Sequence, residues 1–206
     1  MGWVWVTGGM IPDLVRVAVL VGSARAGCRS RSVAEWVCGQ AGHRAELSLD
    51  LIDLATIPLS LAGPTWDPGP GDAATLAETT PRLAEADAFV VVTPEYNHSF
   101  PAVLKNFLDW HVLPWQAKPV GFVSHGGGLG GGVRAVEQLR SVFAELRAVA
   151  LRDTVSFPGG ALAFDEHGRP REQGGGVAAL GTLLDELVWW ALALREARAM
   201  RPYLGG

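Results

Sequence analysis

The sequence predicts a doubly wound α/β fold: a five-stranded parallel sheet of strand order 2-1-3-4-5 with helices on both faces. Two observations indicate this fold. Five short runs are apolar almost throughout and rich in β-branched residues, as is typical of strands buried on both faces. Segments with apolar residues three or four positions apart alternate with these runs. Such a βαβ series requires parallel strands with helices packed over them.

The predicted elements follow in order along the chain. The strands are expected at residues 15–21, 46–52, 88–93, 120–124 and 149–157. The helices are expected near residues 32–40, 73–86, 103–108, 133–146 and 177–198. Asp72 is the expected N-cap of the second helix. The segment 55–72 carries four prolines, and a loop of this length is usually functional or mobile.

The chain is expected to form one domain. A length of 206 residues allows one sizeable core, and no internal repeat or domain linker interrupts the pattern. We expect an extension at 1–14, a single domain at 15–200 and a tail at 201–206. The first thirteen residues lack the basic start of a signal peptide, and Met10 is an alternative start of the chain. No run approaches the roughly 20 apolar residues of a membrane span.

Charge and cysteine content argue against several classes of protein. A net charge of −4 gives no overall attraction to nucleic acid or to an anionic membrane surface, so neither is expected as a partner. The two cysteines, Cys28 and Cys38, cannot form a disulfide framework or a four-ligand zinc site alone. The histidines show no metal-binding spacing, so no metal site is expected. A cytoplasmic location follows as the default.

Three loops with unusual compositions follow predicted strands, and open α/β sheets bind their ligands at the carboxyl ends of strands. The first loop is Gly22–Ser30. Its backbone N–H groups, hydroxyls and arginines suit a phosphate, because amides, the helix dipole and guanidinium groups all stabilise an anion. The alternative is an ordinary polar turn. It is not a Walker loop, since the Gly-Lys-Ser/Thr ending is missing.

The second loop, Thr93–Pro101, has the sequence TPEYNHSFP. Proline fixes φ near both ends, so the N–H groups of Glu95, Tyr96 and Asn97 are expected in one rigid arrangement. Such a loop suits a flat heteroaromatic ring with alternating hydrogen-bond acceptors and donors. The alternative is a capped helix start with Ser99 as the cap, although capping alone does not require Glu-Tyr-Asn in front of it.

The third loop, Ser124–Gly132, contains a formal G-x-G-x-x-G pattern that begins at Gly126. A dinucleotide fingerprint should follow the first strand, and this loop follows the fourth. The acid expected about 20 residues further on falls at Glu145, inside a predicted helix. We therefore interpret the glycines as backbone that packs closely against a planar ligand.

The second loop and the helix after it resemble the signature of the NAD(P)H-dependent FMN reductase family, which includes flavin, quinone, azo-dye and chromate reductases. The residues that carry the resemblance are Pro94–Asn97, Ser99, Pro101, Leu104, Lys105, Asn106, Asp109 and Trp110. The first and third loops are similar to the family's other two blocks in form and order. The resemblance covers about residues 15–157. It implies a flavodoxin-like fold that binds FMN and takes electrons from NADPH or NADH.

Carried over residue by residue, the resemblance implies three groups of cofactor contacts. Ser23, Arg25 and Ser30 would hold the FMN phosphate. One edge of the isoalloxazine ring would be lined by Pro94, Glu95, Tyr96 and Asn97, and the other by Ser124, Gly126 and Gly127. Many relatives have Ser and then Asn where this chain has Cys28 and Ser30. This departure leaves open which individual groups hold the phosphate.

The resemblance implies that hydride passes from NAD(P)H to the flavin and that electrons then pass to flavin, quinone or a similar small acceptor. No side chain is named as catalytic, because the flavin carries the chemistry. His98 and His125 are lesser candidates for contact with a substrate. Two alternatives remain: a flavoenzyme dedicated to one small molecule, and a flavodoxin-like electron carrier, which a charge of only −4 disfavours.

The tryptophans predict self-association. Trp110 and Trp115 end the helix after the second loop, beyond what one sheet face should need, and aromatic residues are enriched in interface cores. The resemblance points the same way, since members of the family commonly build the flavin pocket where two subunits meet. We therefore expect a homodimer or a homotetramer. The alternative is a monomer in which these tryptophans pack under Trp189 and Trp190.

Overall fold

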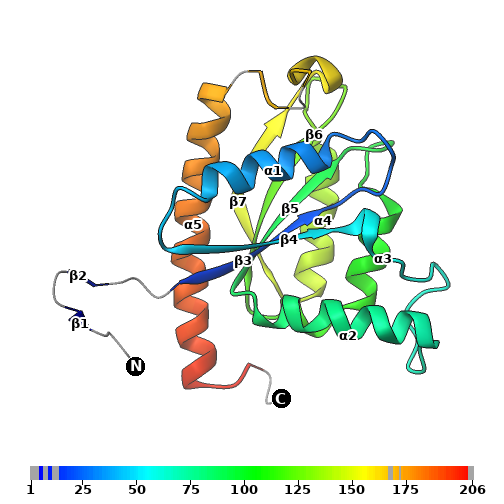
Figure 1. The fold of residues 1–206 in the computed structure, drawn as a ribbon, viewed down its shortest axis with the longest axis vertical. Coiled ribbons are helices and arrows are strands. Elements are labelled where there is room, and N and C mark those ends of the chain that lie inside the picture. Colours follow the sequence, from blue (N-terminus) through cyan, green and yellow to red (C-terminus); the bar gives the residue numbers. More distant parts are fainter. Residues whose placement is uncertain (1–4, 7–8, 11–13, 167–168, 172, 204–206) are drawn as a thin grey trace.

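The computed structural model describes residues 5–6, 9–10, 14–166, 169–171 and 173–203, which Figure 1 shows as a ribbon. Five strands form one sheet of order β4-β3-β5-β6-β7, and every neighbouring pair is parallel. The predicted order 2-1-3-4-5 is confirmed. The strands are β3 (Val15–Val21), β4 (Leu47–Asp53), β5 (Ala88–Pro94), β6 (Pro119–His125) and β7 (Val149–Phe157).

Two short strands precede the sheet and pair with each other in antiparallel fashion, β1 (Trp5–Val6) and β2 (Gly9–Met10). The remainder of the predicted extension, apart from Leu14, lies outside the described residues.

Helices cover both faces of the sheet (Figure 1). One core lies beneath α1 (Ser30–Ala41) and α5 (Gln173–Met200). The other lies beneath α2 (Pro70–Glu85), α3 (Ala102–Trp110) and α4 (Val133–Glu145). On β3, Val19 belongs to the first core and Leu20 to the second. Because both faces are buried, the strand needs apolar residues at nearly every position, which explains its continuous apolar sequence.

The start of α2 differs from the prediction. The helix begins at Pro70, with Gly69 as its N-cap, so the assignment of Asp72 as the cap is wrong. Proline suits the first helical position because its missing N–H would have no partner there and its φ is already helical. Asp72 lies inside the first turn, and its carboxylate accepts the N–H of Ser60 at 2.8 Å. It therefore holds the preceding loop against the helix.

Trp115 lies in the core of its own chain, contrary to the expectation that it is surplus to that core. It follows α3 in the short 3-10 helix η2 (Leu113–Trp115) and is 0% exposed. Its ring packs on Phe89, with the ring centroids 4.5 Å apart. The exposed apolar residues at this corner are its neighbours Val112 and Leu113, 51% and 74% exposed.

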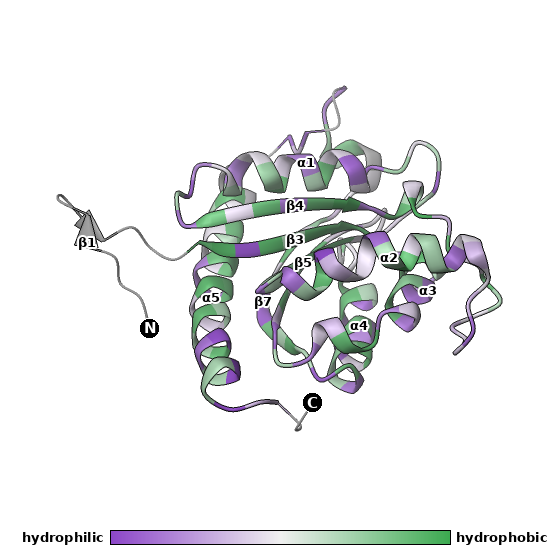
Figure 2. Cartoon of the chain, turned by 60° about the horizontal axis from the view of Figure 1, so that its bottom comes forward, coloured by the Kyte–Doolittle hydropathy of each residue, from purple (hydrophilic) through white to green (hydrophobic). Residues whose placement is uncertain are grey.

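α5 is apolar over most of its length, as Figure 2 shows. Within Gly175–Met200, an 18-residue window has a mean hydropathy of 1.6, so by length and composition alone this helix could cross a membrane. Leu183 and Leu187 are fully buried against the sheet, as in the core helix of an α/β fold. Trp115 belongs to the core beneath α2, α3 and α4, whereas Trp190 packs against the core beneath α1 and α5, and Trp189 is 63% exposed. The alternative in which Trp115 packs under Trp189 and Trp190 is therefore wrong.

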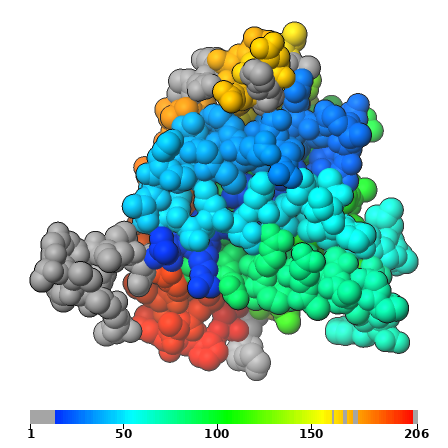
Figure 3. Space-filling view, viewed as in Figure 1, coloured from blue at the N-terminus to red at the C-terminus, as the bar shows by residue number. Residues whose placement is uncertain are grey.

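The segment between β4 and α2 runs over the surface, where Figure 3 shows it beside α2. It opens with the 3-10 helix η1 (Leu54–Thr56) and then forms an irregular loop. The indole N–H of Trp110 donates to the carbonyl oxygen of Ser60 at 3.1 Å, which ties this loop to the end of α3. Trp66, near the tip, is fully exposed.

Candidate functional site

The three loops singled out in the sequence meet at the carboxyl edge of the sheet. They leave the ends of β3, β5 and β6, which are neighbours in the sheet. Side chains join the loops directly: Ser23 Oγ lies 3.1 Å from the phenolic oxygen of Tyr96, and Ser30 Oγ lies 2.9 Å from Nε2 of His125. Ser23, Ser30 and His125 are all buried. The topology therefore brings distant parts of the sequence into one site.

The first loop presents hydrogen-bond donors that have no acceptor in the described part of the chain. Among the described residues, nothing accepts the backbone N–H groups of Ala26, Gly27 and Arg29. The first turn of α1 follows at once, and no side chain caps it. Arg25 is exposed and forms no ion pair with any described residue. Unpaired amides, a helix N-terminus and an unpaired guanidinium form an arrangement that stabilises an anion.

The thiol of Cys28 lies inside this loop, between groups from all three loops. Its sulfur is 3.2 Å from Ser30 Oγ and accepts a hydrogen bond from the hydroxyl of Tyr96 at 3.7 Å. Burial raises the pKa of this thiol, but hydrogen bonds from His125, Ser23 and Ser30 outweigh burial and lower the pKa to about 6. These groups stabilise a negative charge on the sulfur and would serve a phosphate oxygen in the same way.

The second loop is a two-residue β-hairpin. The N–H of Tyr96 donates to the carbonyl of Ser99 at 2.8 Å, and the N–H of Ser99 donates back at 2.9 Å. Between them Asn97 and His98 have φ angles of 51° and 63°, as a type I′ turn requires. Ser99 does not cap a helix, because α3 begins after Pro101. The alternative interpretation of this loop as a capped helix start is therefore wrong.

The amides of the hairpin are divided between internal and open positions. The N–H of Glu95 donates to the carbonyl of His125 at 3.0 Å, and that of Tyr96 is used within the hairpin. The N–H groups of Asn97 and His98 donate to no described residue. Of the three amides expected to be available to a ligand, only that of Asn97 is open, because those of Glu95 and Tyr96 donate within the chain. The N–H group of His98 is a second open donor that was not predicted.

The third loop separates into glycines with open space and glycines that the backbone requires. An added Cβ would meet nothing within 4 Å at Gly127 or Gly128. At Gly132, where φ is 98°, it would lie 2.7 Å from Cβ of Ser124. The open side of Gly127 and Gly128 allows a flat ligand to approach the backbone, whereas Gly132 shapes the turn itself.

Ser124 differs from the other predicted contacts. It is fully buried, its hydroxyl donates to the carbonyl of Gly131 at 2.8 Å, and Ser156 Oγ lies 3.1 Å away. Its side chain is therefore occupied behind the glycine loop. Glu95 is also engaged, because the guanidinium of Arg134 donates to its carboxylate at 3.0 Å.

Two features of the site could not be read fully from the sequence. Cys28 stands out as a departure from the family pattern, but its pKa depends on His125, which arrives from β6. The contacts of α4 with the hairpin have no signal, because Arg134 and Gln138 read as ordinary exposed residues of an amphipathic helix.

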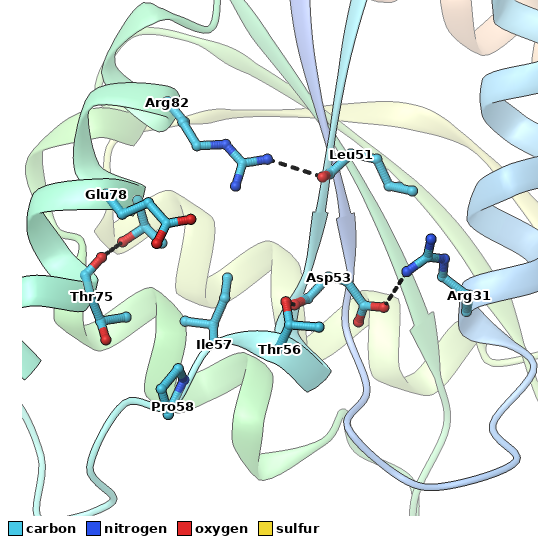
Figure 4. Close-up of a pocket in the computed structure, with 10 residues that line it drawn as sticks. Arg31, Leu51, Asp53, Thr56, Ile57, Pro58, Thr75, Glu78 and Arg82 are labelled. Atoms are coloured by element: carbon cyan, nitrogen blue, oxygen red, sulfur yellow. Dashed lines mark hydrogen bonds and ion pairs between the residues drawn. The ribbon is translucent and has the colours of Figure 1, made fainter. Parts of the chain in front are cut away.

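A separate cavity of about 240 Å³ lies beside β4, between α1 and α2 (Figure 4). Arg31 and Asp53 form an ion pair on one side of it, with 2.8 Å between nitrogen and oxygen. On the other side Arg82 donates to the carbonyl oxygen of Leu51. None of the predicted cofactor contacts lines this cavity, and its arginines already have partners within the chain.

Comparison with known proteins identifies the family. Residues 15–161 match the family model described as NADPH-dependent FMN reductase. An NAD(P)H-dependent FMN reductase of Schizosaccharomyces pombe is 35% identical over 150 residues, which cover 69% of this chain and 74% of that protein. A quinone reductase of Escherichia coli K12 is 35% identical over 155 residues, covering 73% and 80% respectively.

A solved structure shows the same fold. The flavoenzyme FerB of Paracoccus denitrificans, described as an NAD(P)H:(acceptor) oxidoreductase, superposes with a TM-score of 0.71 at 23% identity. The match covers 87% of this chain and 98% of that one. The resemblance inferred from the three loops is confirmed: the chain belongs to the NADPH-dependent FMN reductase family of oxidoreductases.

Proposed function

We propose that this protein binds FMN at the carboxyl edge of its sheet and uses it to transfer electrons from NADPH or NADH to a flavin, a quinone or a similar small acceptor. One observation carries the proposal: loops from β3, β5 and β6 meet there with unpaired donors in two of them and open glycine backbone in the third. The activities named for the FMN and quinone reductases similar to this chain support it.

The phosphate would bind at the first loop. The N–H groups of Ala26, Gly27 and Arg29 have no acceptors within the described part of the chain, and the uncapped start of α1 adds its dipole. Arg25 would supply a charge-assisted hydrogen bond. The hydroxyls of Ser23 and Ser30 would complete the shell.

The isoalloxazine ring would lie between the hairpin and the glycine loop. FMN, when bound, supplies a ring that accepts hydride from NAD(P)H and passes electrons on. The chain's own groups would bind and orient the ring. The N–H groups of Asn97 and His98, which donate to no described residue, would donate to ring acceptors, and the open backbone at Gly127 and Gly128 would allow close approach. Such donors also stabilise negative charge that develops on the ring. No protein acid or base is required.

Consumption of NADPH and NADH by the purified, FMN-loaded protein tests the proposed activity. We expect oxidation of at least one nucleotide that depends on added free FMN or a simple benzoquinone. An FMN-loaded protein that oxidises neither nucleotide with any small acceptor would contradict the reductase. The same protein reduced by a partner protein alone would instead be an electron carrier.

We further infer a homodimer or a homotetramer. Val112 and Leu113 expose apolar side chains just after α3, the helix that follows the hairpin, and such residues are typical of interface cores. Light scattering with FMN bound decides the matter, since a mass near the 21.8 kDa of one chain would contradict self-association.

We also infer a cytoplasmic location. Cys28 and Cys38 are free thiols, which suits a reducing compartment. Fractionation of cells that express the tagged chain would test it, and recovery with membranes or in the secreted fraction would contradict it.

A further inference from the structure

The turn between Tyr96 and Ser99 has an unfavourable backbone conformation. Asn97 and His98 both have left-handed φ angles, 51° and 63°. Asparagine is favoured at the first position of a type I′ turn, but the second position normally belongs to glycine. A residue with a side chain persists in this region only where its surroundings hold it there. His98 is therefore the position at which the hairpin needs outside support.

α4 supplies contacts at this position. The side-chain amide of Gln138 reaches the end of the turn with both of its polar atoms. Its Nε2 donates to the carbonyl oxygen of His98 at 2.7 Å, and its Oε1 accepts the hydroxyl of Ser99 at 2.6 Å. The two bonds fix the peptide that follows His98, which is where the chain leaves the left-handed region.

A second contact one turn earlier on α4 holds the start of the loop. The backbone N–H of Arg134 donates to Glu95 Oε2 at 3.2 Å, and its guanidinium donates to Oε1 at 3.0 Å. α4 begins directly after Gly132, at the end of the glycine loop. The same helix thus joins the two loops between which the ring would lie, and fixes one relative to the other.

We propose that Gln138 is a positioning residue for the flavin ring: by holding the turn at His98 and Ser99, it keeps the N–H groups of Asn97 and His98 in the orientation that binds the ring. This inference rests on the proposed FMN site. Gln138 does not touch the cofactor in this account. It acts through the hairpin, so its removal affects the ring end of the site and leaves the phosphate end intact.

The first test compares FMN with riboflavin, which lacks the phosphate. We expect Gln138→Ala to weaken the binding of both ligands by the same factor, about tenfold for two lost hydrogen bonds. Glu137→Ala is the matched control, since Glu137 neighbours Gln138 on α4, its side chain is 73% exposed, and among the described residues its carboxylate forms an ion pair with Arg140 of the same helix alone. Unchanged riboflavin binding in Gln138→Ala would overturn the proposal, as would an equal loss in the control.

The second test asks whether Gln138 acts through the turn. Asn-Gly is the strongest type I′ sequence, so His98→Gly lets the hairpin form without support from α4. We expect the double variant His98→Gly/Gln138→Ala to bind riboflavin as tightly as the single variant His98→Gly. A tenfold loss that persists in the double variant would show that Gln138 does not act by holding the turn. A merely structural role for Gln138 would lower the melting temperature without this rescue.

A third measurement does not depend on flavin. In the flavin-free protein, the N–H groups of Tyr96 and Ser99 are protected by their mutual bonds. We expect hydrogen exchange at both to be about tenfold faster in Gln138→Ala than in the native chain. Unchanged exchange would show that Gln138 does not hold the turn, even if the chain bound no flavin. Faster exchange in a chain that does not bind flavin would overturn only the proposed FMN site.

Discussion

The two ends of the candidate site are built in opposite ways. In the loop Gly22–Ser30 three backbone amides donate to no described residue, and the loop carries two arginines and no carboxylate. The hairpin Tyr96–Ser99 is closed by its own hydrogen bonds and held by the side chain of Gln138 on α4. A phosphate dianion forms strong charge-assisted hydrogen bonds. The N–H groups of the first loop can therefore remain without acceptors until the phosphate binds. A neutral ring offers weaker bonds, so its donors must be ordered in advance.

Substitution of Arg25 should give the largest difference in effect between the phosphate end and the ring end of the site. Arg25→Ala removes charge-assisted bonds worth about 1.5–3 kcal/mol, which lowers FMN affinity roughly ten- to a hundredfold. Riboflavin should bind the variant and the native chain alike. Isothermal titration with both ligands measures the effect.

Arg147→Ala is the control for Arg25→Ala, because Arg147 is an arginine just beyond the far end of α4 and forms no ion pair with any described residue. Equal FMN affinity in Arg25→Ala and the native chain would remove Arg25 from the site. An equal loss of riboflavin affinity in Arg25→Ala would contradict the distinction between the two ends.

Two glycine substitutions test the role of the glycine loop at the ring end of the site. Gly132→Ala forces a side chain into a left-handed position 2.7 Å from Ser124 Cβ, and should lower the free energy of unfolding by about 1–3 kcal/mol. Gly127→Ala meets nothing within 4 Å, so the fold should keep its stability. If the ring packs against that backbone, Gly127→Ala should nevertheless weaken flavin binding about tenfold. Denaturant titration measures the effect on stability, and flavin titration measures the effect on affinity. Unchanged flavin binding by Gly127→Ala would show that the ring does not pack against this backbone.

The thiols provide the smallest and most local test of the phosphate end. The pKa of Cys28 is lowered to about 6, whereas burial raises that of Cys38 to about 11. Cys28 is therefore a thiolate above pH 6, and its alkylation rate should fall about tenfold for each pH unit below that. FMN should slow the reaction at any pH. Cys28→Ser identifies the reactive thiol, and a midpoint near the ordinary value of about 8.5 would contradict the hydrogen-bonded arrangement.

The sheet could be predicted because burial on both faces leaves a continuous apolar signal, as at β3 and β5. The end of the sheet at which we propose ligand binding follows from topology alone. The orientation of single groups could not be predicted. The family resemblance implies Ser124 as a contact with the ring, but its hydroxyl donates to the carbonyl of Gly131 inside the fold. The bonds from Gln138 to the hairpin depend on how α4 docks, which helical periodicity does not specify.

Titration of the purified protein with FMN and riboflavin, followed by flavin fluorescence, tests the central claim most directly. The account predicts quenching of FMN fluorescence at micromolar concentration, with tighter binding of FMN than of riboflavin because only FMN reaches Arg25 and the open amides of the first loop. A protein that leaves FMN fluorescence unchanged at micromolar concentration would contradict the account.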